Sequence, residues 1–364
     1  MSNELGIIVL DNCKSLGEKV NKHLKKLNNT KKDYIIPTQL MKFNNGEGKA
    51  IIKDTVREKD IFIMSDVTNY SCTYKLINYT NHMSPDDHFQ DIKRVISAMG
   101  GNAAEFSVIM PCLYSERQHR RKGRESLDCA TALQELERMH MKSIIVFDAH
   151  DPNIQNAIPC ISFENFYPTH ILLEKFIENE KIDYNNLLVI SPDFGAMERA
   201  RYYAEMLETE VGVFYKKRDI KALVEGQNPI LCHEYIGPSV EGKDIIIVDD
   251  MIASGESMLD IIKELKKKKI NNIYVFCTFA FFTKGAKAFK EAYDSKVIKR
   301  VYTTNLNYIP EEIAKEKWLC RVDFSMFLAE IINTLYHHHK LSPLMNGKKE
   351  LLEKIKQKNG ENNQ

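Results

Sequence analysis

Short aliphatic segments alternate with amphipathic segments along most of the chain. The apolar runs predicted as strands are Gly6–Leu10, Ile61–Met64, Val108–Met110, Ile144–Phe147, Leu187–Ile190, Val211–Phe214, Ile245–Val248, Ile273–Thr278 and Val301–Thr304. Between them apolar residues recur at spacings of three and four, which is the period of a helix with one buried face. Alternation of this kind is typical of parallel sheets covered by helices. The pattern therefore predicts an α/β protein.

One stretch, residues 244–257, combines a buried strand, two acids, a small-residue loop and the start of a helix. The aliphatic run Ile245–Val248 leads directly into Asp249 and Asp250. The loop that follows, called the phosphate loop below, consists of Ala253, Ser254, Gly255, Glu256 and Ser257. Backbone N–H groups and the dipole at such a helix N-terminus favour a bound phosphate. The two acids suit sugar hydroxyls or a metal, and the alternative is an ordinary βα turn whose acids cap the helix.

Two polar segments in the first half are candidates for nucleotide binding. Phe43, Asn45 and Glu47 place an aromatic ring beside amide and acid groups, which suits base stacking and edge hydrogen bonds; a plain turn is the alternative. Arg117 and Gln118 open a strongly cationic run, and arginine forks match polyphosphate oxygens. A nucleic-acid patch and a solvated charged loop are the other interpretations of that run.

Three further segments follow predicted strands, where open α/β sheets place ligands. His150 comes after one strand and Asp193 after another, and a carboxylate at such a position suits Mg²⁺. A structural histidine and a helix cap are the plainer interpretations. Lys216 and Arg218 follow a third strand, where a basic loop can close over a phosphoryl transition state; a solvated charge run is the alternative.

Composition limits the class of protein. A chain of 364 residues is long enough for two domains, and its net charge of +1 argues against a generally basic nucleic-acid binder. The 8 cysteines are scattered without a Cys-x-x-Cys pair, as expected for small core residues in a reducing compartment. The first residues resemble neither a signal peptide nor a membrane span. We therefore expect a cytoplasmic protein that binds no membrane and no nucleic acid.

Taken together and in order, these segments resemble the ribose-phosphate diphosphokinases, also called phosphoribosyl pyrophosphate synthetases. The chain is similar to that family over about residues 6–346. The matching segments are Phe43–Glu47, Arg117–Arg121, Asp148–His150, Ser191–Gly195 with Arg199–Arg201, Lys216–Arg218, the phosphate loop and Val322–Ile331. This sequence departs from the family pattern at Asn45, His119, Ala253 and Glu256.

The resemblance implies a fold of two tandem phosphoribosyltransferase-like domains, each a mainly parallel sheet flanked by helices. Their expected bounds are residues 1–166, joined by a C-terminal helix at 325–346, and residues 167–324. Residues 347–364 are expected to form a solvated tail, since their lysine-rich composition is typical of unfolded segments. The family also implies a homo-oligomer in which dimers assemble to a hexamer.

The implied reaction transfers the β,γ-diphosphoryl group of ATP to the C1 hydroxyl of ribose 5-phosphate and releases AMP. The resemblance assigns adenine to Phe43, Asn45 and Glu47, and further ATP contacts to Arg117 and Gln118. It assigns Mg²⁺ to His150 and Asp193, and catalysis to Lys216, Arg218 and His150. The ribose 5-phosphate residues it implies are Asp249, Asp250, Ala253, Ser254, Gly255, Glu256 and Ser257.

Two other functions are compatible with parts of the pattern. A non-catalytic regulatory subunit related to these enzymes would explain the departures at Asn45, His119 and Ala253, but not the retention of His150 and Lys216. A salvage phosphoribosyltransferase would explain the phosphate loop alone. It needs one domain rather than two, so the tandem arrangement disfavours it.

Overall fold

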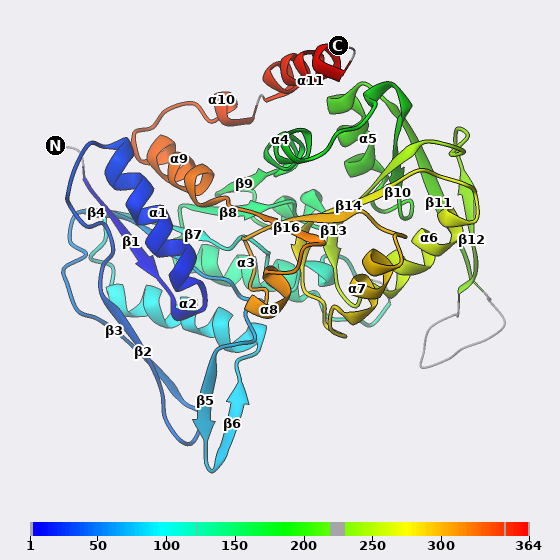
Figure 1. Cartoon of the computed structure of the whole chain (residues 1–364). Helices are drawn as coiled ribbons and strands as arrows, with labels where there is room; N and C mark the ends of the chain where they lie inside the picture. The colour runs from blue at the N-terminus through cyan, green and yellow to red at the C-terminus, as the bar shows by residue number, and fades with distance from the viewer. Residues whose placement is uncertain (1–2, 122, 219–229, 346, 363–364) are drawn as a thin grey trace. The chain divides into compact units, whose positions relative to one another are not determined.

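The computed structural model describes residues 3–121, 123–218, 230–345 and 347–362, without the side chains of 216–218, 230–233 and 359–362 (Figure 1). The chain divides into two compact units. Unit 1 contains Met1–Tyr167, Asn305–Tyr308 and Asp323–Met345, and unit 2 contains Pro168–Thr304, Ile309–Val322 and Asn346–Gln364. Each unit is built on its own sheet.

The sheet of unit 1 is entirely parallel. Its strand order is β1-β4-β7-β8-β9. The strands are β1 (Glu4–Val9), β4 (Lys59–Met64), β7 (Glu105–Ile109), β8 (Ser143–Phe147) and β9 (Ser162–Phe166). Residues of β8 are buried throughout, which explains its unbroken aliphatic sequence.

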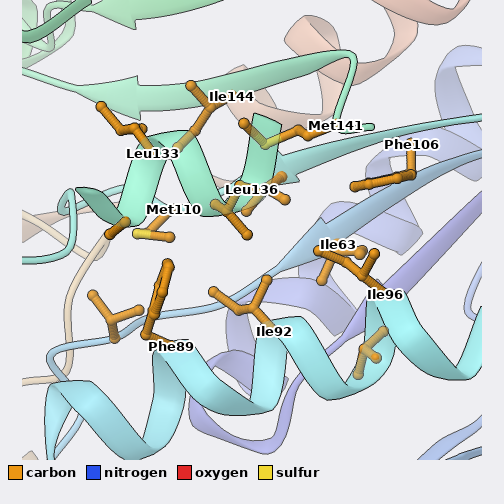
Figure 2. Packing of buried hydrophobic residues seen from close by; sticks show 14 of the residues in the cluster. Ile63, Phe89, Ile92, Ile96, Phe106, Met110, Leu133, Leu136, Met141 and Ile144 are labelled. Carbon is orange, nitrogen blue, oxygen red and sulfur yellow. The ribbon is translucent and has the colours of Figure 1, made fainter. Parts of the chain in front are cut away.

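Helices bury the apolar residues of this sheet. They are α1 (Lys14–Leu27), α2 (Pro85–Met99), α3 (Asp128–Arg138) and α9 (Ser325–Tyr336), with short 3-10 turns η1 (Asp11–Cys13), η2 (Glu116–Gln118) and η3 (Pro152–Ala157). Figure 2 shows Phe89, Ile92 and Ile96 pointing from α2 into the core that α3 and the strands complete. Ser84 and Asp87 form a capping box that starts α2.

The C-terminal helix α9 packs in unit 1. The rings of Phe324 and Phe327 lie 6.3 Å and 6.1 Å from that of Phe147 in β8. Asn28, at the end of α1, donates to the Asn333 side chain at 2.8 Å. The expected helix over 325–346 is interrupted in the structure: α9 ends at Tyr336, and a separate turn, α10, covers Ser342–Met345.

Two hairpins complete unit 1. One pairs β2 (Thr38–Lys42) with β3 (Gly48–Ile52), and the other pairs β5 (Thr73–Leu76) with β6 (Tyr79–His82), drawn in cyan in Figure 1. The backbone N–H of Ile77, at the tip of the second hairpin, donates to Asn44 O at 2.7 Å. The second hairpin therefore supports the turn of the first.

Unit 2 contains a sheet with strand order β12-β11-β10-β13-β14-β15-β16, in which β11 and β12 are antiparallel and the other pairs are parallel. The strands are β10 (Leu187–Ser191), β11 (Glu210–Arg218), β12 (Ile230–Ile236), β13 (Asp244–Ile252), β14 (Ile273–Ala280), β15 (Arg300–Thr304) and β16 (Leu319–Val322). The helices are α4 (Thr169–Asn179), η4 (Tyr184–Asn186), α5 (Met197–Leu207), α6 (Glu256–Lys266), α7 (Lys287–Asp294), α8 (Glu311–Ala314) and α11 (Lys348–Asn362). The prediction of two α/β domains with mainly parallel sheets is confirmed.

The last segment differs from its prediction as a solvated tail. Residues Lys348–Asn362 form α11, in which Leu351 and Ile355 are buried. Lys354 pairs with Glu174 of α4 at 2.9 Å. The physical reason is that two apolar residues four apart share one face of a helix and can be buried together, although the composition is mostly polar. No helix in the described ranges is long and apolar enough to span a bilayer.

Candidate active site

The phosphate loop connects β13 to α6 in unit 2. Gly255 caps the helix with φ +82°, and a Cβ built there would lie 2.3 Å from the Phe289 ring. Glycine is therefore required twice, for the backbone angle and for the close approach of α7. Backbone N–H groups of the first helical turn lack partners within the helix itself, so the loop has the geometry that binds anions.

Glu256 is the first residue of α6 and makes two side-chain contacts. Its Oε1 lies 2.8 Å from Nζ of Lys284, and its Oε2 accepts from Ser254 Oγ at 3.3 Å. The Lys284 ammonium holds the pKa of the Glu256 carboxyl below its usual range. The charge that Glu256 adds to the loop is thus matched by a cation from another segment.

Asp249 and Asp250 lie inside β13 rather than after it, because Asp249 still pairs with Cys277 of β14. Asp250 is 3% exposed and Asp249 is half-buried. Burial, and next the charge of Asp250, hold the pKa of Asp249 well above its usual range. Arg199 opposes this shift and Asp193 adds to it, so both are electrostatic neighbours of Asp249. Crowded carboxylates of this kind favour a bound cation or hydroxyl donors.

Asp193 follows β10, the strand beside β13, and organises the turn into α5. Its Oδ1 accepts from the backbone N–H groups of Gly195 at 2.9 Å and Ala196 at 3.2 Å. The N-cap of α5 is Ala196, so Asp193 does not cap the helix itself but holds the turn that precedes it. These hydrogen bonds leave Asp193 able to bind a metal, because a carboxylate has two oxygens and several lone pairs.

Lys216 and Arg218 are residues of β11, not of a loop after it. Their backbone pairs with His233 and Ile230 of β12, with a shift of register between Lys217 and Arg218. The side chains of Lys216 and Arg218 lie outside the described residues. Their roles remain predictions.

In unit 1, the Phe43–Glu47 turn closes the β2–β3 hairpin. Phe43 N donates to Glu47 O and Gly46 N to Phe43 O, both at 2.8 Å. The Asn45 amide donates to Glu47 Oε2 at 3.0 Å and accepts from Glu47 N at 3.1 Å. Phe43 is 46% exposed. The turn therefore presents an accessible aromatic ring beside a rigid pair of polar side chains, which suits a planar base.

A second polar group in unit 1 joins η2 to the end of β8. Arg117 and Gln118 are exposed on η2, and the ring of His119 lies 5.3 Å from that of His150. His119 Nε2 is 3.3 Å from Asp151 Oδ2. The structure thus brings the cationic segment and the candidate histidine to one place.

Three neighbours of these residues were given no role from the sequence alone. Glu116 is buried and accepts from the His150 backbone N–H at 3.3 Å, so it holds that loop. Arg199 and Lys284 are the cations beside Asp249 and Glu256. An arginine in the Arg199–Arg201 motif was the available signal for the first of these cations.

The two predicted metal residues belong to different units, His150 to unit 1 and Asp193 to unit 2. Among the residues that the structure describes, no group of three or more His, Cys, Asp or Glu side chains forms a metal cluster. The carboxylates of Asp193 and Asp249 are nevertheless the oxygen donors that Mg²⁺ prefers, whereas the imidazole of His150 fits less well.

Two family models match the chain. The model described as the N-terminal domain of ribose phosphate pyrophosphokinase matches residues 5–139, and the phosphoribosyl transferase domain model matches residues 170–315. Their bounds fall within unit 1 and largely within unit 2, respectively.

Curated relatives are similar at low identity over most of the chain. A ribose-phosphate pyrophosphokinase of Mycoplasma genitalium is 28% identical over 268 residues, covering 72% of this chain and 73% of the relative. That of Vibrio parahaemolyticus is 25% identical over 309 residues, covering 84% and 90%. The crystal structure of phosphoribosylpyrophosphate synthetase from Mycobacterium smegmatis superposes with a TM-score of 0.75 at 18% identity, covering 92% of this chain and 99% of that one. This last likeness concerns the fold.

Proposed function

The chain belongs to the ribose-phosphate pyrophosphokinase family, and we propose from this premise that it joins ATP and ribose 5-phosphate. The products are 5-phosphoribosyl 1-diphosphate and AMP. The observation that carries the proposal is the phosphate loop placed at the end of β13, two residues after the half-buried Asp249 and buried Asp250. It offers anion donors and hydroxyl acceptors next to each other, as a sugar phosphate requires.

Unit 2 supplies the ribose 5-phosphate residues in this proposal. Backbone N–H groups of the phosphate loop and the hydroxyls of Ser254 and Ser257 bind the 5-phosphate. Asp249 and Asp250 accept hydrogen bonds from the ribose hydroxyls. Burial first, and then the charge of Asp250, disfavour the ionised Asp249 carboxylate and raise its pKa, and hydrogen bonds donated by sugar hydroxyls would stabilise that ionised form.

Unit 1 supplies the ATP residues. The exposed ring of Phe43 stacks on adenine, while Asn45 and Glu47 meet its polar edge. Arg117 and Gln118 contact the phosphates, beside His150. Stacking and forked charge-assisted bonds together give the orientation that an in-line transfer needs.

Mg²⁺ is the proposed cofactor, with Asp193 as the residue whose carboxylate chemistry fits it best. The Asp249 carboxylate stands beside Asp193 and can share the ion's charge. His150 is proposed to position the metal-bound polyphosphate, which is the role that the family resemblance implies. Bound Mg²⁺ would neutralise phosphate charge during the transfer.

Lys216 and Arg218 are proposed to neutralise the negative charge that grows on the β-phosphorus and on the departing AMP. Phosphoryl transfer needs positioning and electrostatic stabilisation rather than a covalent nucleophile.

We further propose a cytoplasmic homo-oligomer of dimers that assemble to a hexamer. The scattered cysteines are compatible with this location, and those whose side chains are described, all but Cys232, form no disulfide.

The test is AMP formation from ATP, ribose 5-phosphate and Mg²⁺ by the full chain. We expect turnover, and Lys216→Ala to lower kcat by about 100- to 1000-fold, as removal of a transition-state donor typically does. Lys263→Ala, which removes a surface lysine paired with Asp260 on α6, is the matched control and should leave kcat unchanged.

The same assay separates the alternatives. A non-catalytic regulatory subunit would give no AMP at any enzyme concentration. A salvage phosphoribosyltransferase would release pyrophosphate from the activated sugar and a free base, without ATP. Either result would overturn the proposal.

A further inference from the structure

A cation lies beside the phosphate loop on a segment that the proposed function does not use. Lys284 belongs to the connection between β14 and α7. That connection runs along the loop: Phe281 N donates to Ile252 O at 2.8 Å and Thr283 N to Ala253 O at 3.0 Å. The backbone next to Lys284 is therefore fixed by one hydrogen bond to the end of β13 and by another to the phosphate loop.

The Lys284 ammonium is directed to the anion-binding end of α6. Its Nζ lies 2.8 Å from Glu256 Oε1, and Glu256 is the first residue of that helix. The second carboxylate oxygen accepts from the Ser254 hydroxyl at 3.3 Å. Ammonium, carboxylate and hydroxyl thus form one group at the place where backbone N–H groups favour an anion.

This ion pair contributes little to folding. The Lys284 and Glu256 side chains are 65% and 62% exposed, and pairs so exposed have small net effects on stability. Glu256 alone would oppose a phosphate at the same helix end, because like charges a few ångströms apart repel even near water. Lys284 removes that conflict, and it has three N–H donors, enough for two acceptors at once.

We propose that Lys284 is a ribose 5-phosphate-binding residue, held at the phosphate loop by Glu256. The ammonium contacts the 5-phosphate while it stays paired with the carboxylate. Glu256 is a positioning residue in this arrangement. The proposal rests on the proposed function, since it names a further ligand of the phosphate that unit 2 binds.

The test measures ribose 5-phosphate binding to the full chain by titration calorimetry, separately from turnover. We expect Lys284→Ala to weaken binding by about 10- to 100-fold, the usual loss for one charge-assisted hydrogen bond. Lys284→Arg keeps the cation and should retain most of the affinity. Lys287→Ala removes a neighbouring surface lysine that pairs with Glu291 and should bind as the wild type does.

A double-mutant cycle tests the role of Glu256. With Lys284 already replaced by Ala, the added change Glu256→Gln should recover binding by several-fold, about 3- to 10-fold, because it removes an unpaired negative charge beside the phosphate. When Lys284 is present, Glu256→Gln should change the affinity for ribose 5-phosphate by less than it does in the Lys284→Ala variant. If the two changes are simply additive, the proposed coupling is wrong.

The outcomes distinguish this inference from the proposed function. If the wild type binds ribose 5-phosphate but forms no AMP, the proposed function fails and the binding cycle still decides the role of Lys284. If the wild type turns over and Lys284→Ala binds with unchanged affinity, Lys284 is only a surface ion-pair partner. Circular dichroism of each variant establishes that it is folded before its affinity is compared.

Discussion

At the scale of single residues, Gly255 shows how tightly the phosphate loop is specified. Its φ of +82° lies where side chains with a Cβ are disfavoured, and its missing Cβ leaves room for the Phe289 ring. Phe289 is itself buried, so it cannot move aside without disturbing the core of unit 2. The loop geometry thus depends on one residue for two independent reasons.

We predict that Gly255→Ala destabilises the chain by several kcal/mol, about 1–2 from the backbone angle and the rest from the clash. Ribose 5-phosphate binding should fall by at least about 10-fold, since small shifts at a binding site are costly. Thermal unfolding and calorimetry measure the two effects.

The control is Gly242→Ala, at φ +72° with no atom within 4 Å of its added Cβ. This substitution should lower the free energy of unfolding only through the unfavourable backbone angle, by about 1–2 kcal/mol. It should not affect ribose 5-phosphate binding. Equal losses of stability in both variants would show that Phe289 imposes no limit on Gly255.

A second residue, Asp66, makes the stability of unit 1 depend on pH. Burial raises the pKa of Asp66 to about 6, although its carboxylate accepts hydrogen bonds from Thr68 and from Tyr308 N at 2.7 Å. The folded chain therefore holds this proton more tightly than an unfolded chain, whose pKa is 3.8. Protonated Asp66 therefore contributes its full stabilisation of the fold below pH 3.8, the pKa in the unfolded chain, and this contribution is lost as the pH rises through 6.

Asp66→Asn should remove this dependence. Between pH 4 and pH 7 the wild type loses about 2 kcal/mol of stability at this position, and the variant does not. The variant's deficit relative to the wild type should therefore shrink as the pH rises. Urea unfolding at pH 4.5, 5.5 and 7 measures it; a deficit that stays constant or grows with pH would contradict the prediction.

At the scale of helices and strands, the sequence predicts most clearly those strands that are buried on both faces of their sheet. Every strand predicted from an aliphatic run is present in the sheets. The strands that were not predicted are the hairpin strands β2, β3, β5 and β6 and, in the two large sheets, β9, β12 and β16, which all lie at a sheet edge. β9 and β16 are partly exposed and keep polar residues, so they lack an unbroken apolar run, whereas β1 is also at an edge but is buried along most of its length and was predicted.

The helix α11 gives a prediction at this scale. Leu351 is fully buried in unit 2, so Leu351→Asp should release α11 from α4 and destabilise the unit by about 2–5 kcal/mol. Limited proteolysis should then cut within residues 348–358. Gln357→Asp introduces the same side chain at an exposed position of the same helix and should resist cleavage. Equal cleavage of both variants would mean that Leu351 does not anchor the helix.

At the scale of the whole molecule, only those parts of the site whose residues are neighbours in the sequence could be predicted. The phosphate loop and its two acids are consecutive, so their order alone indicated a sugar-phosphate site. Lys284 approaches Glu256 from 28 residues away, and Glu116 supports the backbone of His150 from 34 residues away. Such pairings depend on strand order and on loop paths, which residue spacing does not contain.

Removal of the metal tests how the two substrates depend on it. Chelation of Mg²⁺ should abolish AMP formation, yet ribose 5-phosphate should still raise the melting temperature, because the phosphate loop binds through N–H groups. Asp193→Asn should retain the turn into α5, since an amide oxygen can still accept from Gly195 N and Ala196 N. Its lost charge should raise the free Mg²⁺ needed for half-maximal rate by about 10-fold.

The matched variant Asp193→Ala removes both the charge and the acceptor of the Gly195 N and Ala196 N hydrogen bonds. It should show the same shift in Mg²⁺ dependence and an added loss of about 1 kcal/mol in stability. Rates measured against free Mg²⁺ concentration, together with thermal unfolding of both variants, separate the two roles. If Asp193→Asn depends on Mg²⁺ as the wild type does, Asp193 only holds the turn, and the ion is held by other carboxylates, of which Asp249, its electrostatic neighbour, is one candidate.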